Sequence, residues 1–192
     1  MIKKCLISGS FDPITKGHID LLERALQISN QLIIGVFNNE EKEYLFDFES
    51  RVKLCSIATK HFERVQVIGD TGMLYEFCKR ENIDGIVRGF RNYTDYEYET
   101  EMAKFNYLNC GVMTYLLPAS SGYSKLSSSI VRQLFNNCKS KFNDSKKTEE
   151  IENYLPKDVV CEIRRMTNEW FYENIKRTWK WNKRFKKVYA WW

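Results

Sequence analysis

The chain has 192 residues, of which 43% are hydrophobic, 15% aromatic and 29% charged, with a formal net charge of +5 and only 3 Pro and 9 Gly. This composition excludes a disordered or collagen-like chain. No stretch approaches the roughly 20 consecutive apolar residues of a membrane-spanning helix. Residues 1–8 also lack the apolar stretch and cleavage site of a signal peptide. We therefore expect a cytoplasmic protein built on one compact domain.

The positive charge is concentrated at the C-terminal end. Residues 174–192 contain seven basic residues and no acidic ones, which leaves a formal charge of −2 for residues 1–173. All five tryptophans lie in the same region, at positions 170, 179, 181, 191 and 192. The basic character of the chain therefore belongs to a C-terminal tail with its own composition.

Six cysteines are spread along the chain without a CxxC pair or a neighbouring histidine that would complete a zinc site. We interpret them as reduced, buried thiols, and we predict no protein metal centre.

Apolar runs alternate with helical patterns along the chain. The expected strands cover residues 5–7, 32–37, 65–68, 83–87 and 112–117. Helical spacing appears between them at 19–26, 52–58, 74–78 and 95–109. Continuously apolar strands that alternate with helices favour an α/β fold: a Rossmann-like, open, parallel five-stranded sheet with helices on both faces. Ligands of such sheets bind beyond the carboxyl ends of the strands, so the loops there are the candidates for chemistry.

The pattern also predicts how the chain is divided. The α/β core covers residues 1–135, and a polar stretch rich in Lys, Glu and Asn forms a linker or insertion at 136–154. Pro156 is suited to the first turn of a last helix. That helix and the basic, Trp-rich tail make a C-terminal helical extension over 155–192.

The loop after the first expected strand has the sequence SGSFDPITKGH at 8–18. Gly9 lets the backbone approach a ligand closely, and Ser10 offers a hydroxyl and an amide. His18 falls at the start of a helix, where backbone N–H groups and the helix dipole favour anions. The loop thus favours phosphate binding, whereas Asp12-Pro13 is interpreted as turn chemistry.

Two further loops have a similar character. RGFR at 88–91 sets two guanidinium groups around a glycine. Three serines at 127–129 open a helix, where hydroxyls and free amides either cap the helix or cradle a phosphate. Three anion-binding loops at one edge of the same expected sheet point to a phosphate-bearing substrate.

The motifs TKGH at 15–18 and SSS at 127–129 resemble the nucleotidylyltransferase superfamily. A fuller pattern is similar to the phosphopantetheine adenylyltransferase family, from about residue 3 to 135 and weakly around 155–163. The pattern consists of GSFDPITKGHIDLLERAL at 9–26, Glu49 and Arg51, RGFR at 88–91, DYEYE at 95–99 and SSSIV at 127–131.

The resemblance implies transfer of AMP from ATP to 4′-phosphopantetheine, which yields dephospho-CoA and pyrophosphate by in-line attack in coenzyme A biosynthesis. It also implies Mg²⁺ as cofactor, held on the phosphates, and a homo-oligomer, by family a hexamer. His18, Lys42 and Ser10 would be catalytic, and Ser10, Lys42, Leu74 and Arg88 would bind the acceptor. The expected ATP-binding residues are Ser10, Phe11, His18, Gly89, Phe90, Arg91, Glu99, Tyr123, Ser124, Lys125, Leu126, Ser127, Ser128 and Ser129.

Two other functions remain open at this point. A related nucleotidylyltransferase would act on another phosphorylated acceptor, and a non-catalytic module would bind nucleotide without turnover. The tail has three interpretations. It packs on the enzyme or a neighbouring subunit, it docks a membrane surface or protein partner, or it binds nucleic acid, which we consider the least favoured.

Overall fold

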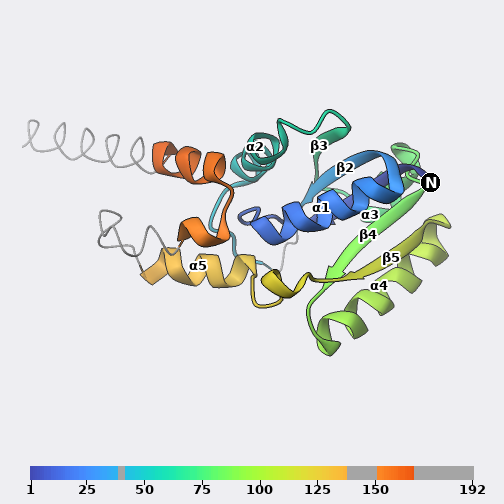
Figure 1. Cartoon of the computed structure of the whole chain (residues 1–192). Coiled ribbons are helices and arrows are strands. Elements are labelled where there is room, and N and C mark those ends of the chain that lie inside the picture. Colours follow the sequence, from blue (N-terminus) through green and yellow to red (C-terminus); the bar gives the residue numbers. More distant parts are fainter. Residues whose placement is uncertain (39–41, 138–150, 167–192) are drawn as a thin grey trace, which may run out of the picture.

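The computed structural model describes residues 1–38, 42–137 and 151–166, and within them the chain forms one parallel sheet (Figure 1). The strand order is β3-β2-β1-β4-β5, and each neighbouring pair is parallel. The strands are β1 (Ile2–Gly9), β2 (Ser29–Phe37), β3 (Val65–Asp70), β4 (Gly85–Phe90) and β5 (Met113–Pro118). The five expected strands and their parallel arrangement are therefore confirmed.

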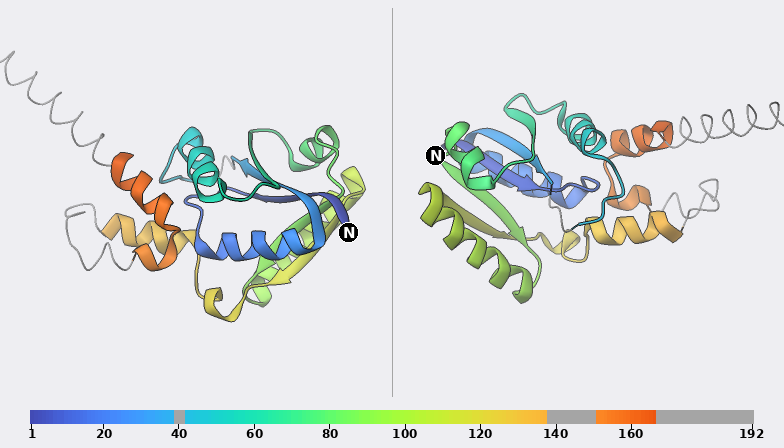
Figure 2. Two further views of the ribbon diagram at one scale, coloured as in Figure 1. Left: turned by 45° about the horizontal axis from the view of Figure 1, so that its top comes forward. Right: turned by 180° about the vertical axis from the view of Figure 1, so that it is seen from behind.

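Helices connect the strands and continue after the last one (Figures 1 and 2). They are α1 (Lys16–Ile28), α2 (Phe48–Thr59), α3 (Leu74–Arg80), α4 (Tyr93–Cys110) and α5 (Ser128–Asn137), with a short 3₁₀ turn at Ser121–Tyr123. Residues 151–154 and 157–166 are also helical.

The sheet is covered on both faces, as the alternation of its strand residues shows. On β1, Cys5 and Ile7 lie in a core cluster with residues of α1, α2 and α5, whereas Leu6 lies in a second cluster with Phe77 and Cys78 of α3. Successive strand residues point to opposite faces, so both faces of β1 must be apolar. Helices on both faces are thus confirmed.

One strand boundary differs from the expectation in a way that matters for the site. The apolar pattern predicts a strand ending at residue 87, but β4 continues to Phe90 because Arg88, Gly89 and Phe90 pair with residues 116–118 of β5. The backbone hydrogen bonds of a parallel ladder do not require apolar side chains. Arg88 therefore projects from a strand rather than from a loop.

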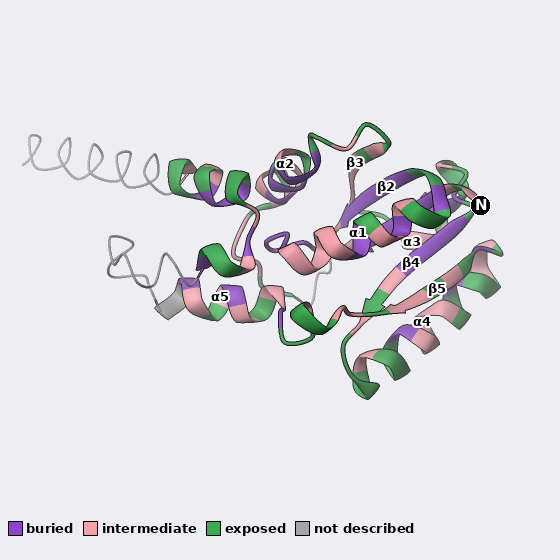
Figure 3. Ribbon diagram, in the orientation of Figure 1, coloured by how far each residue is buried: buried purple, intermediate pink, exposed green. Residues whose placement is uncertain are grey.

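The segment 151–166 packs against the same core as α1, α2 and α5. Figure 3 shows buried positions along this segment. Ile151, Leu155, Val159 and Ile163 are all buried in that cluster. Most of the predicted linker, residues 138–150, lies outside the described residues, as does the tail from residue 167 onward.

Candidate active site

A cleft of about 880 Å³ opens at the carboxyl edge of the sheet. It is lined by the ends of β1 and β4, the first turns of α1 and α5, and part of α4. Of the expected site residues, the cleft brings together Ser10, Phe11, His18, Lys42, Arg88, Gly89, Arg91, Glu99, Tyr123, Leu126, Ser127, Ser128 and Ser129.

Four expected site residues do not line the cleft. Leu74 begins α3 and packs against the core cluster around Phe77. The Phe90 ring lies edge-on to Tyr96, with 5.3 Å between ring centroids. Ser124 donates its hydroxyl to the Ser121 carbonyl, and Lys125 is exposed.

His18 is held as a neutral hydrogen-bond donor. Its Nδ1 accepts a hydrogen bond from the Thr15 backbone N–H at 2.9 Å, so the ring proton of the neutral imidazole is carried by Nε2. Burial, followed by the positive charges of Arg88 and Arg91, lowers the pKa of His18 to about 4. The Phe11 ring packs edge-on against the imidazole at 5.0 Å between centroids. His18 can therefore donate to a phosphate oxygen at neutral pH without carrying a charge.

Arg88 is fixed by a carboxylate from α4. Its Nε and one terminal nitrogen each donate to an oxygen of Glu99 at 2.7 Å, and its other terminal nitrogen donates to the Ser8 carbonyl and hydroxyl. Glu99, expected to bind ATP, has both carboxylate oxygens on Arg88, and the residue is only 8% exposed. The pair fixes the plane of the guanidinium group beside the cleft.

Arg91 is held in a similar way at the start of α4. Its Nε donates to Asp95 Oδ2 at 2.8 Å, and the Arg91 backbone N–H donates to the same oxygen at 3.2 Å. The hydrogen bond from Arg91 holds the pKa of Asp95 below its usual value. Asn92 caps the helix through its side-chain oxygen, which accepts from the Asp95 N–H at 2.8 Å.

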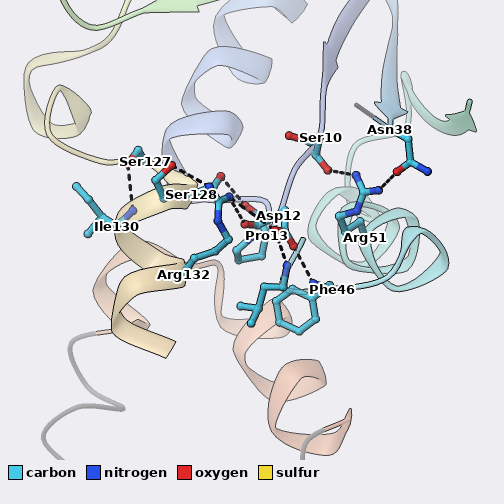
Figure 4. A network of polar contacts seen from close by, with 12 residues as sticks. Ser10, Asp12, Pro13, Asn38, Phe46, Arg51, Ser127, Ser128, Ile130 and Arg132 are labelled. Atoms are coloured by element: carbon cyan, nitrogen blue, oxygen red, sulfur yellow. Dashed lines mark hydrogen bonds and ion pairs between the residues drawn. The ribbon is translucent and has the colours of Figure 1, made fainter. Parts of the chain in front are cut away.

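The three serines at the start of α5 have separate roles, and Figure 4 labels two of them, Ser127 and Ser128. Ser127 Oγ accepts from the Ile130 N–H at 3.2 Å and so caps the helix. Ser128 Oγ donates to the Pro13 carbonyl at 2.9 Å, and Ser129 Oγ accepts from Arg132 at 2.9 Å. The helix start is therefore tied to the loop after β1, as well as facing the cleft.

Several lining residues were not in the predicted site. Asp20, Arg24, Tyr44, Thr94, Asp95, Tyr98 and Arg132 all line the cleft. Arg132 lies one turn after Ser129, and Asp20 and Arg24 follow Gly17 at helical spacing, so a helical projection from each loop could have found these three. Tyr44 follows Lys42 closely, but its side chain reaches the cleft only through the tertiary fold.

The cleft favours anions over metal ions. Within the described residues, no cluster of three or more His, Cys, Asp or Glu side chains is arranged to hold a metal. Two of the carboxylates at the cleft, Asp95 and Glu99, are engaged by Arg91 and Arg88. Guanidinium groups, helix starts and a neutral histidine donor together form a site for phosphate groups.

A family profile described as cytidylyltransferase-like matches residues 6–134, and with the phosphate-facing cleft of this parallel sheet it places the chain among the nucleotidylyltransferases. The chain is 39% identical over 165 residues to the phosphopantetheine adenylyltransferase of Clostridium botulinum (strain Alaska E43 / Type E3), covering 84% of this chain and 96% of that protein. It belongs to the phosphopantetheine adenylyltransferase family.

Another relative and a solved structure are also similar to this chain. The phosphopantetheine adenylyltransferase of Thermobifida fusca (strain YX) is 38% identical over 133 residues, which cover 69% of this chain and 81% of that protein. The structure of Plasmodium falciparum nicotinic acid mononucleotide adenylyltransferase complexed with NaAD has a TM-score of 0.59 at 15% identity, over 86% of this chain and 96% of that one. At that identity the likeness shows the shared fold.

Proposed function

We propose that this protein transfers AMP from ATP to the phosphate of 4′-phosphopantetheine, which produces dephospho-CoA and pyrophosphate in coenzyme A biosynthesis. The observation that carries the proposal is the convergence of Ser10, His18, Arg88, Arg91 and the serines at 127–129 on one cleft. Membership of the family supports the choice of acceptor.

The reaction needs positioning and charge stabilisation rather than a covalent enzyme intermediate. An oxygen of the acceptor phosphate attacks the α-phosphorus of ATP, and the bond from that phosphorus to the bridging oxygen breaks, so that pyrophosphate leaves. The attacking oxygen is already anionic and needs no base. His18, a neutral donor through Nε2, would stabilise the charge that develops on the α-phosphate.

The acceptor would be held by Arg88 and Lys42, which line the same cleft. Glu99 then serves the acceptor indirectly, because it sets the orientation of Arg88. Ser10 and the Phe11 amide would contact the ATP phosphates, and Arg91 with the start of α5 would hold the nucleotide.

Mg²⁺ would enter with ATP and be bound mainly by phosphate oxygens and water, which suits its preference for a largely hydrated octahedral shell. This assignment agrees with a cleft whose carboxylates Asp95 and Glu99 already pair with arginines. The ion would neutralise phosphate charge during the transfer.

The test is a pyrophosphate-release assay with purified protein, ATP and Mg²⁺, in which 4′-phosphopantetheine, nicotinamide mononucleotide and glycerol phosphate are compared as acceptors. We expect release only with 4′-phosphopantetheine, and dephospho-CoA detected by mass spectrometry. Turnover of another acceptor would support a related nucleotidylyltransferase. ATP binding without any product would support a non-catalytic module.

We also propose a homo-oligomer, by family a hexamer. Large side chains of α4 and β5 are exposed, among them Tyr98, Tyr107, Leu108 and Met113, and such an apolar surface is typical of subunit contacts. Native mass spectrometry of the wild-type protein and of Leu108→Lys would test this, because a charge in the contact should lower the assembly's mass. If Leu108→Lys forms an assembly of the same mass as the wild type, this surface is not the subunit contact.

We further propose a cytoplasmic location, where ATP is available. Within the described residues no helix combines the length and apolarity that crossing a bilayer requires. Cys5, Cys55, Cys78, Cys110 and Cys161 are free thiols, in keeping with a reducing compartment.

A further inference from the structure

Arg51 on α2 is a fully buried arginine behind the cleft. One of its terminal nitrogens donates to the Ser10 carbonyl at 2.7 Å and to the Phe37 carbonyl at 3.1 Å, and the other donates to the Asn38 side-chain oxygen (Figure 4). Among the residues that the structure describes, no carboxylate forms an ion pair with it. The nearby Asp47 carboxylate interacts with this charge without forming an ion pair, and a buried charge held mainly by carbonyl groups and rings is costly, so its location calls for a specific role.

The first contact sets the direction of a peptide group at the cleft. The bond between Ser10 and Phe11 is trans, so the Ser10 carbonyl and the Phe11 N–H point in opposite directions. Because Arg51 draws the carbonyl toward α2, the Phe11 N–H is directed away from α2. Phe11 also has φ +48°, an uncommon conformation for a residue with a side chain, which persists only where neighbours hold it.

A second contact links Arg51 to the segment that carries Lys42. The guanidinium carbon lies 4.0 Å from the ring centroid of Tyr44. The residues that follow, Leu45 and Phe46, donate their backbone N–H groups to the buried carboxylate of Asp12 at 2.8 and 2.9 Å. Arg51 and Asp12 thus join the segment 42–46 to the loop after β1.

The opposite side of that loop is held by α5. Arg132 donates to the Asp12 carbonyl at 3.0 Å, and Ser128 donates to the Pro13 carbonyl at 2.9 Å. The carbonyls of residues 10, 12 and 13 are therefore all engaged by side chains from α2 and α5 (Figure 4). The Ser10 and Phe11 amides form no hydrogen bond to any residue within the described part of the chain, which leaves both available to an anion.

We propose that Arg51 is a positioning residue for adenylyl transfer: it holds the Ser10–Phe11 peptide and the Lys42 segment in the arrangement in which both face the reacting phosphates. Arg51 acts from behind the cleft and does not line it. The inference rests on the proposed function. It predicts that loss of Arg51 impairs the chemical step more than ground-state binding of ATP, because the groups that it aligns are needed most when charge moves between the phosphates.

The test compares Arg51→Met and Arg51→Lys with Leu54→Ala, a control in the same helix whose side chain is buried away from the cleft. For Arg51→Met we expect kcat to fall by roughly 10- to 100-fold, while the calorimetric Kd for ATP changes by less than about threefold. Arg51→Lys, which keeps the charge but not the planar fork, should recover only part of kcat. Leu54→Ala should lose stability and keep the kcat of the folded enzyme.

A second measurement does not depend on turnover. Addition of ATP should shift the backbone amide resonance of Phe11 in the wild-type ¹⁵N spectrum, and Arg51→Met should abolish most of that shift. If the wild type makes no dephospho-CoA but shows the shift, and Arg51→Met abolishes it, the proposed function fails while the positioning role stands. If Arg51→Met, or Arg51→Lys should the former not fold, keeps the wild-type kcat and Phe11 response, Arg51 is only structural and the inference is wrong.

Discussion

His18 combines two properties that are hard to obtain together in water: it is uncharged and it has a fixed donor. The Thr15 N–H occupies Nδ1, and burial beside two arginines disfavours the imidazolium form. A protonated ring would have to break the contact with Thr15, since Nδ1 would then also be a donor. The same environment that attracts phosphate thus keeps its histidine neutral.

The pKa of His18 has a consequence for stability as well as activity. The unfolded chain binds a proton at the ordinary histidine pKa of 6.5, whereas the folded chain binds it only near pH 4. Between these values the unfolded state carries more protons, so the free energy of unfolding should decrease as pH falls from about 6.5 to 4. Urea unfolding should show this slope in the wild type and a weaker one in His18→Asn. Ring ¹⁵N spectra showing an Nδ1–H tautomer at pH 7 would contradict the assignment.

His18→Ala should retain the fold and lose activity. Removal of one preorganised donor to a developing charge costs about 10²- to 10³-fold in kcat, and we expect that range here. Steady-state kinetics with both substrates saturating provides the measurement, and circular dichroism provides the control for folding. A loss below tenfold would show that another group stabilises the α-phosphate.

Glu99→Gln tests the pairing that orients Arg88. An amide replaces one acceptor oxygen with a donor, so it cannot accept both guanidinium hydrogen bonds. We expect a loss of about 2 kcal/mol in stability and a KM for 4′-phosphopantetheine raised by roughly tenfold, with a smaller change for ATP. Glu97→Gln, on the exposed side of α4, is the matched control. A larger effect on ATP would assign Glu99 to the nucleotide instead.

At the scale of elements, α4 determines the site because its first half presents Asp95 and Glu99 to the arginines of β4 and the turn after it. Its end is defined by Gly111, which has φ +73° and whose N–H donates to the Tyr107 carbonyl. A glycine at this left-handed position ends a helix at low cost. The helix therefore has a capped start at Asn92 and a glycine end.

Gly111→Ala should lower the free energy of unfolding by about 1 kcal/mol, because a side chain is disfavoured at positive φ. A Cβ at Gly111 would meet no atom within 4 Å, so the change isolates the backbone term. Gly122→Ala, where a Cβ also has open space but φ is not in the left-handed region, is the control and should be close to neutral. Urea midpoints measure both, and equal effects would contradict the backbone explanation.

At the scale of the whole molecule, the catalytic cleft and the C-terminal tail are separate in sequence. Among the described residues, those that line the cleft all lie between Ile7 and Arg132, and the segment 151–166 completes the core through Leu155 and Val159. The basic, Trp-rich residues 170–192 lie outside the described part of the chain.

A protein shortened after residue 169 should keep kcat within about twofold of the full chain, because it retains the cleft and the buried segment 151–166. Sedimentation of both forms with anionic lipid vesicles then tests the tail. If only the full chain sediments with the vesicles, the tail binds a membrane surface. If neither form sediments, the result favours a tail that packs on the enzyme or docks a protein partner. A tenfold loss of kcat in the shortened protein would show that the tail contributes to the cleft.

Some features of this protein were determined by the sequence itself. The apolar strands and helical spacing predicted the parallel sheet, since a strand buried on both faces must be apolar throughout. The loops after β1 and before α5 were recognisable as phosphate-binding loops. Both place glycine, serine or histidine at the start of a helix, and both lie at the same edge of the expected sheet. The family resemblance followed from the same motifs, including RGFR at 88–91.

Other features were decided only by the tertiary structure. Arg51 belonged to a recognisable pattern near Glu49, but its contact with Ser10 spans 41 positions of sequence. The pairing of Arg88 with Glu99 likewise depends on how α4 packs beside β4. Local patterns describe which backbone conformation and which face a residue prefers. The partner of a buried charge is set by long-range packing, because an unpaired charge in a low-dielectric core must be satisfied by whatever the fold brings beside it.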